Sequence, residues 1–268
     1  MNAAAYPLQR DAAEHDRLQA QARFWSADAA ALFDSAGIGR GWRVADLGCG
    51  TLDVASLLAD RVGPQGTVCA LDNDSLLVRR LQPLARQVAG AAVRVLEGDA
   101  WCTGWPDGCL DAVHARFLAA PAGRLDELVA QMRRLVRPGG LVLLQEPDAR
   151  SWQLPAGGPA WSELLRLIRA GFALRGGCFD AGRALLPALE RAGLAAIERR
   201  CVVRHVPAGH AYAALPLAFA RQLRPLWLHE GLAAESELDE LLAQVGAALA
   251  AGGLAGTFPL VQAWGRVG

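Results

Sequence analysis

The stretch from Val44 to Ala59 restricts the possible folds more than any other part of the chain. It opens with an apolar run that ends at Asp46 and Leu47, passes through Gly48-Cys49-Gly50, and continues with apolar residues at helical spacing. This order predicts a strand, a tight turn and a helix, because glycine permits sharp turns and the close approach of backbone N–H groups to a ligand. Such a turn can hold a nucleotide-like ligand at the carboxyl edge of a parallel sheet.

The same turn departs from the dinucleotide-binding pattern, which has a third glycine three residues after the second. Position 53 of this chain is Asp, so a pyrophosphate would face a carboxylate there. The turn therefore favours a ligand without phosphates over NAD. A plain strand–helix turn with no ligand is the alternative, because Gly-x-Gly turns are common.

Composition excludes several other classes of protein. With 53% hydrophobic and 20% charged residues the chain can bury a substantial core, and its zero net charge argues against nucleic-acid binding. No apolar run approaches 18 residues and the start lacks a signal-like core, so we expect a cytoplasmic protein that does not bind membranes. The six cysteines form no Cys-x-x-Cys pair, so we expect reduced thiols and no metal site.

Strand and helix patterns alternate along much of the chain, which predicts a doubly wound parallel sheet. Helical spacing predicts one helix over 11–36, and the region after Asp148 is predicted to be largely helical. The expected strands are 42–47, 67–72, 93–96, 110–114, 141–145, 195–206 and 257–267. The expected later helices are 53–60, 74–88, 125–136, 161–174, 181–192, 211–228 and 235–251.

Two further aspartates follow strands in this pattern. Asp72 ends the second strand, where a carboxylate can accept both hydroxyls of a ribose held over the glycine turn. A helix N-cap is the alternative role for Asp72, but Asp74 and Ser75 are better suited to it. Asp99, which follows the third strand, can accept the amino group of an adenine while the adjacent backbone N–H faces a ring nitrogen.

These sites, in this order, resemble the class I S-adenosylmethionine-dependent methyltransferases, most closely the small-molecule enzymes of the ubiquinone-biosynthesis type and their natural-product relatives. The resemblance lies in 44–52, 70–74, 97–100, 110–116 and 135–148. It implies an α/β, Rossmann-like sheet of seven strands, mostly parallel, with an antiparallel last strand at 259–265. It also implies a single methyltransferase domain over 1–268, with an N-terminal arm and helix (1–36), a cofactor-binding core (40–148) and a helical lid (149–180 and 208–252).

The resemblance implies S-adenosylmethionine as cofactor and S-adenosylhomocysteine as product. Backbone at Gly48–Gly50 would hold the amino-acid part of the cofactor, Asp46 its ammonium, and Gln21 or Arg23 its carboxylate. The implied cofactor-binding residues are Tyr6, Gln21, Arg23, Asp46, Gly48, Cys49, Gly50, Asp72, Asn73, Asp99, Ala100 and His114.

Leu52 departs from the family, which usually has glycine at this position. Leucine does not readily adopt a positive φ, and its side chain would lie beside the amino-acid end of the cofactor. We therefore expect either an adjusted turn or a reduced affinity for the cofactor.

Methyl transfer is an in-line displacement that needs a base only when the nucleophile must lose a proton. His114 is a candidate base or a residue of the cofactor shelf, and Glu146 is a second candidate base or an ion-pair partner of Arg116. Aromatic residues after Asp148 either line a substrate pocket or pack the helical segments onto the sheet. The candidate substrate residues are Trp152, Trp161, Phe172, His210, Phe219 and Trp227.

The leading hypothesis is methyl transfer to an O or N atom, with C as a further option, of a small apolar or aromatic biosynthetic metabolite. A second hypothesis, prompted by Leu52, is a methyltransferase-like cyclase or isomerase that binds the cofactor without transferring its methyl group. A third is a catalytically inactive subunit that stabilises a partner. The expected partner of an enzyme is a small-molecule substrate, and the expected assembly is a monomer or homodimer.

Overall fold

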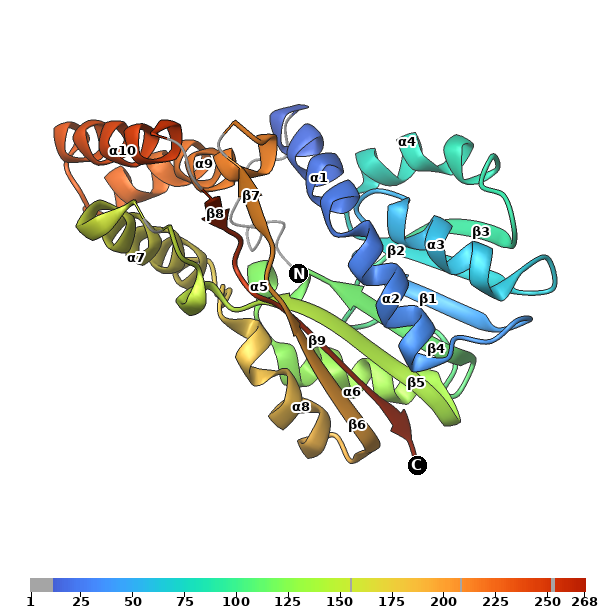
Figure 1. The fold of residues 1–268 in the computed structure, drawn as a ribbon. Helices are drawn as coiled ribbons and strands as arrows, with labels where there is room; N and C mark the ends of the chain where they lie inside the picture. The colour runs from blue at the N-terminus through green and yellow to red at the C-terminus, as the bar shows by residue number, and fades with distance from the viewer. Residues whose placement is uncertain (1–11, 155, 208, 252–253) are drawn as a thin grey trace.

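The computed structural model describes residues 12–154, 156–207, 209–251 and 254–268, and its main feature is a seven-stranded sheet (Figure 1). Each neighbouring pair is parallel except those of β9, which runs antiparallel to both β5 and β6. The strand order is β3 (Ala92–Glu97), β2 (Thr67–Asp72), β1 (Arg43–Leu47), β4 (Leu110–Arg116), β5 (Val136–Pro147), β9 (Leu260–Val267), β6 (Leu194–Val202). The prediction of a mostly parallel sheet whose last strand is antiparallel is confirmed.

Helices cover both faces of this sheet. One face carries α2 (Ser26–Ala36), α3 (Asp53–Val62) and α4 (Ser75–Ala85), and the other carries α5 (Ala119–Ala122), α6 (Leu125–Leu135) and α8 (Leu185–Arg191). Successive strand residues belong to opposite cores, as Val44 and Ala45 do. This follows from strand geometry, in which alternate side chains point to opposite faces.

A group of helices forms a cap at one end of the molecule (Figure 1). It consists of α7 (Gly158–Leu174), α9 (Leu215–His229) and α10 (Glu235–Ala250), which pack against one another, with the small sheet β7 (His205–Pro207) and β8 (Leu254–Gly256) beside them. The short helices η2 (Ala149–Ser151), η3 (Ala181–Ala184) and η4 (Ala211–Ala214) connect these elements. Among the described residues, no helix is long and apolar enough to cross a membrane.

The cap and the sheet share one apolar core. The larger cluster of buried side chains joins Val113 of β4 and Leu144 of β5 to Leu167 of α7, Leu223 of α9 and Leu238 of α10. Because these elements bury their apolar faces against each other, the cap has no separate core. This continuity favours the prediction of a single domain.

The prediction of one helix over 11–36 is wrong, because the structure divides this region at Trp25. The chain forms α1 (Ala12–Phe24) and α2, with Trp25 between them at φ −96° and ψ 8°. The buried Trp25 indole donates to the hydroxyl oxygen of Tyr212 at 2.7 Å, and the Phe24 ring stacks on the Tyr212 ring at 3.9 Å. Contacts with η4, which lies far along the sequence, thus break the helix.

Both long C-terminal strands are also shorter than predicted. The segment 195–206 divides into β6 and β7, and the segment 257–267 contributes β9 only from Leu260. The cause is a second pairing, in which β7 bonds to β8 while Thr257 and Arg204 exchange backbone and side-chain hydrogen bonds. The remaining predicted elements occur, with ends that differ by a few residues.

Candidate functional site

The glycine turn after β1 has the backbone conformation that glycine permits. Gly48 and Gly50 have φ values of +68° and +52°, in the left-handed region, and the Cys49 N–H donates to the Leu71 carbonyl at 2.9 Å. A Cβ atom at Gly48 would lie 2.8 Å from a methyl carbon of Leu118, whereas no described atom lies within 4 Å of that position at Gly50. The turn therefore needs glycine at Gly48 for close packing as well as for its φ.

Leu52 does not strain this turn, in agreement with the first of the two expected alternatives, an adjusted turn. It lies before the first residue of α3 at φ −79° and ψ 8°, a conformation open to any residue. Its half-buried side chain packs against the apolar cluster beneath α2 and α3. The third glycine of the family is not required by the backbone of this chain.

The Asp72 carboxylate is held by backbone groups from two loops. Oδ2 accepts from the Gly50 N–H at 2.9 Å and Oδ1 accepts from the Asp74 N–H at 3.0 Å. The Asp72 carbonyl also accepts from the Gly98 N–H at 2.9 Å. These bonds orient the Asp72 carboxylate. The exposed Asn73 follows it, and Asp74 caps α4, as predicted for Asp74.

Asp99 lies after β3, the strand that pairs in parallel with β2. Its Oδ1 accepts from the Trp101 N–H at 2.9 Å, which closes a tight turn around the buried Ala100. Because β2 and β3 are neighbouring parallel strands, Asp72 and Asp99 lie at the same edge of the sheet. Trp101, which sequence reasoning did not single out, extends this edge, and its indole donates to the Arg124 carbonyl at 3.1 Å.

Asp46 and His114 form a buried pair on β1 and β4. Their exposed fractions are 2% and 1%, and Asp46 Oδ1 lies 2.8 Å from His114 Nδ1. His114 Nε2 lies 2.8 Å from the amide nitrogen of Gln145, and the Phe33 ring packs edge-on against the imidazole at 5.1 Å. Both ring nitrogens are therefore engaged. No described residue hydrogen-bonds to the other oxygen of Asp46, Oδ2, which is buried.

Arg116, at the end of β4, is a half-buried side chain that contains a second buried polar atom. Its Nη1 is buried and has no hydrogen-bond partner among the described residues, while its guanidinium lies 5.9 Å from the centre of the Phe117 ring. Burial lowers the pKa of Arg116, and the charge of Asp46 opposes this shift. Sequence reasoning missed this residue as a ligand contact, although its position at the carboxyl end of a central strand was a signal.

Glu146 anchors the start of α5 and does not pair with Arg116. Its Oε1 accepts from the N–H groups of Leu118 and Ala119 at 2.9 and 2.8 Å, and its Oε2 accepts from that of Ala120 at 3.0 Å. The side chain is fully buried. Burial raises the pKa of Glu146 to about 7, against the opposing effect of the three backbone donors. This arrangement favours a positioning role for Glu146 over that of a base.

The structure does not test the predicted cofactor contacts near the N-terminus. Tyr6 lies outside the described residues. The buried Gln21 accepts from Arg17 Nη1 at 2.5 Å, and Arg23 is exposed. Their role toward a cofactor carboxylate stays a prediction.

The candidate substrate aromatics pack mainly against one another. Trp152 and Trp161 lie 5.2 Å apart edge-on, and Phe172 stacks on Phe179 at 4.5 Å, with Phe219 edge-on to both phenylalanines. A cavity beside Trp152, Trp161 and Tyr212 has a volume of about 10 Å³, which is room for one water molecule. The geometry favours the packing alternative for these rings.

Two other candidate substrate residues have structural contacts. Trp227 of α9 is fully buried against α7, where its indole nitrogen lies 2.9 Å from the position that a Cβ atom at Gly171 would take. His210 is exposed, and its Nδ1 accepts from the Tyr212 N–H at 3.1 Å. A role toward substrate stays a prediction for both.

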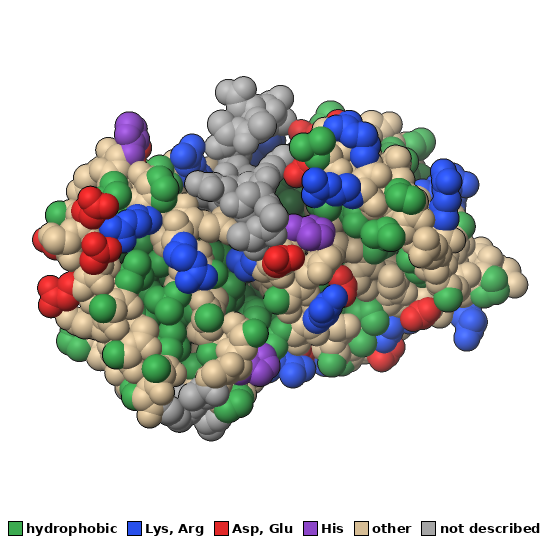
Figure 2. All heavy atoms as spheres, turned by 90° about the horizontal axis from the view of Figure 1, so that it is seen from above, with side chains coloured by type: hydrophobic (Ala, Val, Ile, Leu, Met, Phe, Trp, Pro, Cys, Tyr) green, Lys and Arg blue, Asp and Glu red, His purple; other side chains and the backbone are tan. Residues whose placement is uncertain are grey.

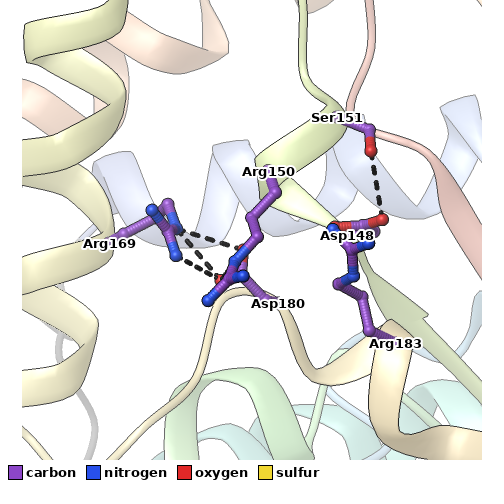
Figure 3. A network of polar contacts seen from close by, with 6 residues as sticks. All are labelled: Asp148, Arg150, Ser151, Arg169, Asp180 and Arg183. Atoms are coloured by element: carbon purple, nitrogen blue, oxygen red, sulfur yellow. Dashed lines mark hydrogen bonds and ion pairs between the residues drawn. The ribbon is translucent and has the colours of Figure 1, made fainter.

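An open groove of about 510 Å³ lies between the loop after β5 and α7, lined in part by Arg150, Trp152 and Arg169. Figure 3 shows Arg150 and Arg169 reaching the same carboxylate, that of Asp180, at 3.0 and 2.6 Å. Seen from above, the cap side of the molecule has exposed hydrophobic side chains with basic side chains near them (Figure 2). Across the described ranges, no group of three or more His, Cys, Asp or Glu side chains is placed to hold a metal ion.

The comparisons with known proteins agree with this geometry. A family model described as a methyltransferase domain matches residues 44–140. The ubiquinone/menaquinone biosynthesis C-methyltransferase UbiE of Pseudomonas putida strain GB-1 is 38% identical over 112 residues, which are 41% of this chain and 43% of the relative. Nocamycin O-methyltransferase of Saccharothrix syringae is 29% identical over 238 residues, 83% of this chain and 84% of the relative. The chain thus matches less than half the length of the UbiE relatives.

Solved structures share the fold at low identity. A protein of Bacillus halodurans C-125 described as a presumed methyltransferase superposes with a TM-score of 0.60 at 16% identity, over 90% of this chain and 98% of that one. The [4+2]-cyclase SpnF superposes with a TM-score of 0.53 at 20% identity, over 91% of this chain and 81% of that one.

The family model covers the glycine turn, Asp72 and Asp99, and the fold superposes on that of solved proteins described as methyltransferases. S-adenosylmethionine is the cofactor of this family, and a structural neighbour, geranyl diphosphate methyltransferase, has been solved in complex with it. The chain therefore carries a match to a methyltransferase domain over residues 44–140 and resembles the class I S-adenosylmethionine-dependent methyltransferases.

Proposed function

We propose that this chain transfers a methyl group from S-adenosylmethionine to a small molecule. The observation that carries the proposal is a pair of buried atoms near the glycine turn, Asp46 Oδ2 and Arg116 Nη1, which have no hydrogen-bond partner among the described residues. A buried charge that lacks partners is costly, so a ligand that supplies the opposite charges is strongly favoured there. The amino-acid end of the cofactor carries an ammonium and a carboxylate, which complement Asp46 and Arg116 respectively.

The remaining contacts follow the chemistry of the adenosyl group. Asp72, oriented by Gly50 and Asp74, accepts from the ribose hydroxyls, and Asp99 with the backbone at Ala100 holds the adenine. When bound, the cofactor supplies a methyl group on a positively charged sulfur. The chain contributes alignment and exclusion of water, which are the main sources of rate for such a displacement.

We infer that neither His114 nor Glu146 acts as a base. Both nitrogens of His114 are engaged, and each oxygen of Glu146 accepts from backbone N–H groups of residues 118–120. A base must reach the proton that it removes, and these two side chains have exposed fractions of 1% and 0%. The substrate atom that receives the methyl group then either carries no proton, or loses its proton to water or to another group of the substrate.

We propose that the substrate is a small apolar or aromatic biosynthetic metabolite, with O, N or C as the acceptor atom. Nocamycin O-methyltransferase, which matches this chain over most of its length, supports a natural product as substrate. We also propose that the protein is cytoplasmic, is a monomer or homodimer, and acts without nucleic acid. The cyclase alternative is not favoured, because Leu52, which prompted it, has an unstrained backbone.

Calorimetry with S-adenosylhomocysteine tests the binding step. We expect binding by the wild-type protein, and a large loss of affinity in Asp46→Asn and in Asp72→Ala, because each removes a charge that faces the ligand. Gln244→Ala, an exposed change on α10, serves as the control. Absence of binding, or unchanged affinity in both aspartate variants, would remove the proposal.

The transfer step needs a separate measurement. Extracted metabolites incubated with the protein and isotopically labelled S-adenosylmethionine should yield a labelled small molecule. Binding of the cofactor without any labelled product would point to the cyclase or partner-binding alternatives instead.

A further inference from the structure

A chain of buried hydrogen bonds crosses the sheet on the face covered by α2. It runs from Asp46 on β1 to His114 on β4, Gln145 on β5, Gln262 on β9 and Arg200 on β6, which are successive strands of the sheet. The four bonds measure 2.8, 2.8, 2.9 and 2.8 Å in that order. Asp46, His114, Gln145 and Gln262 are each 2% exposed or less.

The donor and acceptor at each of these hydrogen bonds are determined from the Gln262 end of the series. There, one neighbouring group can only accept and another can only donate. The backbone carbonyl of Asp28 can only accept, so the Gln262 atom 3.0 Å from it is the NH₂ group. The guanidinium of Arg200 can only donate, so the Gln262 atom 2.8 Å from its Nε is the carbonyl oxygen. Both neighbours independently require the same orientation of the Gln262 amide.

The orientation of the Gln262 amide determines that of the Gln145 amide, and through it the protonation of the His114 imidazole. The NH₂ group of Gln262 also donates to Gln145 Oε1 at 2.9 Å, so the NH₂ group of Gln145 faces His114. An amide NH₂ cannot accept, so His114 Nε2 must be the acceptor and carries no proton. The proton of the ring is therefore on Nδ1, which donates to Asp46 Oδ1 at 2.8 Å.

We propose that Gln145 and Gln262 are positioning residues that set the His114 tautomer and thereby hold the Asp46 carboxylate for the ligand. In this arrangement Oδ1 of Asp46 is fixed by an Nδ1–H donor, and Oδ2 keeps its acceptor capacity for a cation. The assignment of that cation to the ammonium of the cofactor rests on the proposed function. The tautomer itself follows from the hydrogen bonds alone.

Nitrogen NMR of the ligand-free, full-length protein, labelled with ¹⁵N at histidine, measures the tautomer directly. The His114 signals are assigned by their loss in His114→Asn. We expect a proton on Nδ1 and none on Nε2 in the wild-type protein. A proton on Nε2 would overturn the proposal, whether or not any ligand binds.

Gln262→Glu tests control of the tautomer from two hydrogen bonds away. A carboxylate at this position, beside Arg200, accepts from Gln145 and turns the amide oxygen of Gln145 toward His114. We expect Nε2 to become protonated and the affinity for S-adenosylhomocysteine to fall about tenfold, the size of one lost hydrogen bond to a charged group. Gln244→Glu makes the same exchange on the exposed surface of α10 and should change neither quantity.

The two measurements separate this inference from the proposed function. If the wild-type protein has the Nδ1 tautomer but binds no S-adenosylhomocysteine, the proposed function fails while the tautomer assignment stands. If the tautomer changes in Gln262→Glu while the affinity stays that of the wild type, the positioning role is overturned. If Gln262→Glu does not fold, the tautomer of the wild-type protein still tests the tautomer assignment. The affinity of Gln262→Met, which removes the Gln262 donor, then tests the positioning role.

Discussion

At the residue scale, the candidate site is marked by buried polar atoms that have no hydrogen-bond partner in the part of the chain that the structure describes. Most buried polar atoms in proteins have hydrogen bonds, so an exception needs an explanation. Asp46 Oδ2 and Arg116 Nη1 are such atoms, and both lie at the ends of adjacent central strands. Binding of a ligand with both charges explains the pair better than a structural role does.

Arg116→Met should lower the affinity for the ligand without lowering the stability of the protein. Methionine has a similar length but no charge, so we expect the affinity for S-adenosylhomocysteine to fall at least about tenfold. The free energy of unfolding should stay constant or rise by about 1 kcal/mol or more, because a half-buried guanidinium is removed whose Nη1 lacks a hydrogen-bond partner among the described residues. Calorimetry and urea denaturation measure the two effects. Arg23→Met, an exposed change on α1, is the control, and an unchanged affinity in Arg116→Met would contradict this prediction.

Alanine at the two turn glycines should have unequal effects. Both positions have positive φ, which costs alanine about 1 kcal/mol. At Gly48 the new Cβ would also lie 2.8 Å from Leu118, so we expect a loss of about 2 kcal/mol or more there and less at Gly50. Urea denaturation of Gly48→Ala and Gly50→Ala checks the order, and equal losses would show that the Leu118 contact relaxes.

At the scale of single elements, the short helix α5 depends on one buried carboxylate. Glu146 receives three backbone N–H groups at the start of α5, which otherwise has no side-chain cap. The first N–H groups of a helix lack partners within the helix, so an acceptor there stabilises it. Glu146 thus joins β5 to α5.

Glu146 should make stability depend on pH. Its pKa rises from an ordinary value of 4.5 to about 7 in the folded protein, so between these values the folded state binds more protons than the unfolded chain. The free energy of unfolding therefore falls as the pH rises through this window, by roughly 2 kcal/mol between about pH 5 and pH 8. Urea denaturation across this range should show the fall in wild type but not in Glu146→Gln. The exposed Glu163→Gln should keep the wild-type slope.

At the scale of the whole molecule, one aromatic cluster joins the cap to the sheet. The Phe258 ring contacts Trp25, Phe117, Trp152 and Phe179, which come from four separate segments, at centroid distances of 5.3 to 5.8 Å. Trp152 and Phe179 in turn contact the Phe219 ring of α9. The rings therefore connect the N-terminal helices, the sheet and the cap. The cap and the sheet should therefore unfold together.

Phe258→Ala tests this coupling. Removing a fully buried phenylalanine should cost about 3–5 kcal/mol, and the loss should appear equally in tryptophan fluorescence and in far-UV circular dichroism. Leu76→Ala, whose side chain is largely exposed, should change stability by less than about 0.5 kcal/mol. Two separate transitions in wild type, one for each probe, would mean that the cap is an independent domain.

The sequence alone determined the fold class and the edge at which the predicted ligand-binding aspartates lie. Alternating strand and helix patterns are local, and the rule that the carboxyl ends of parallel strands meet at one edge then brings Asp46, Asp72 and Asp99 to it. The glycine turn was also local, because Gly48 and Gly50 supply the positive φ that it needs.

Only the tertiary structure decided which side chains are engaged in contacts within the protein. The break at Trp25 depends on Tyr212, 187 residues away, and the His114 tautomer depends on Gln145 and Gln262, which lie 117 residues apart. The same contacts between distant segments engage His114 and Glu146, whereas Arg116 Nη1 has no hydrogen-bond partner within the described ranges. Local patterns carry no information on such pairings, because packing between segments far apart in the chain determines them.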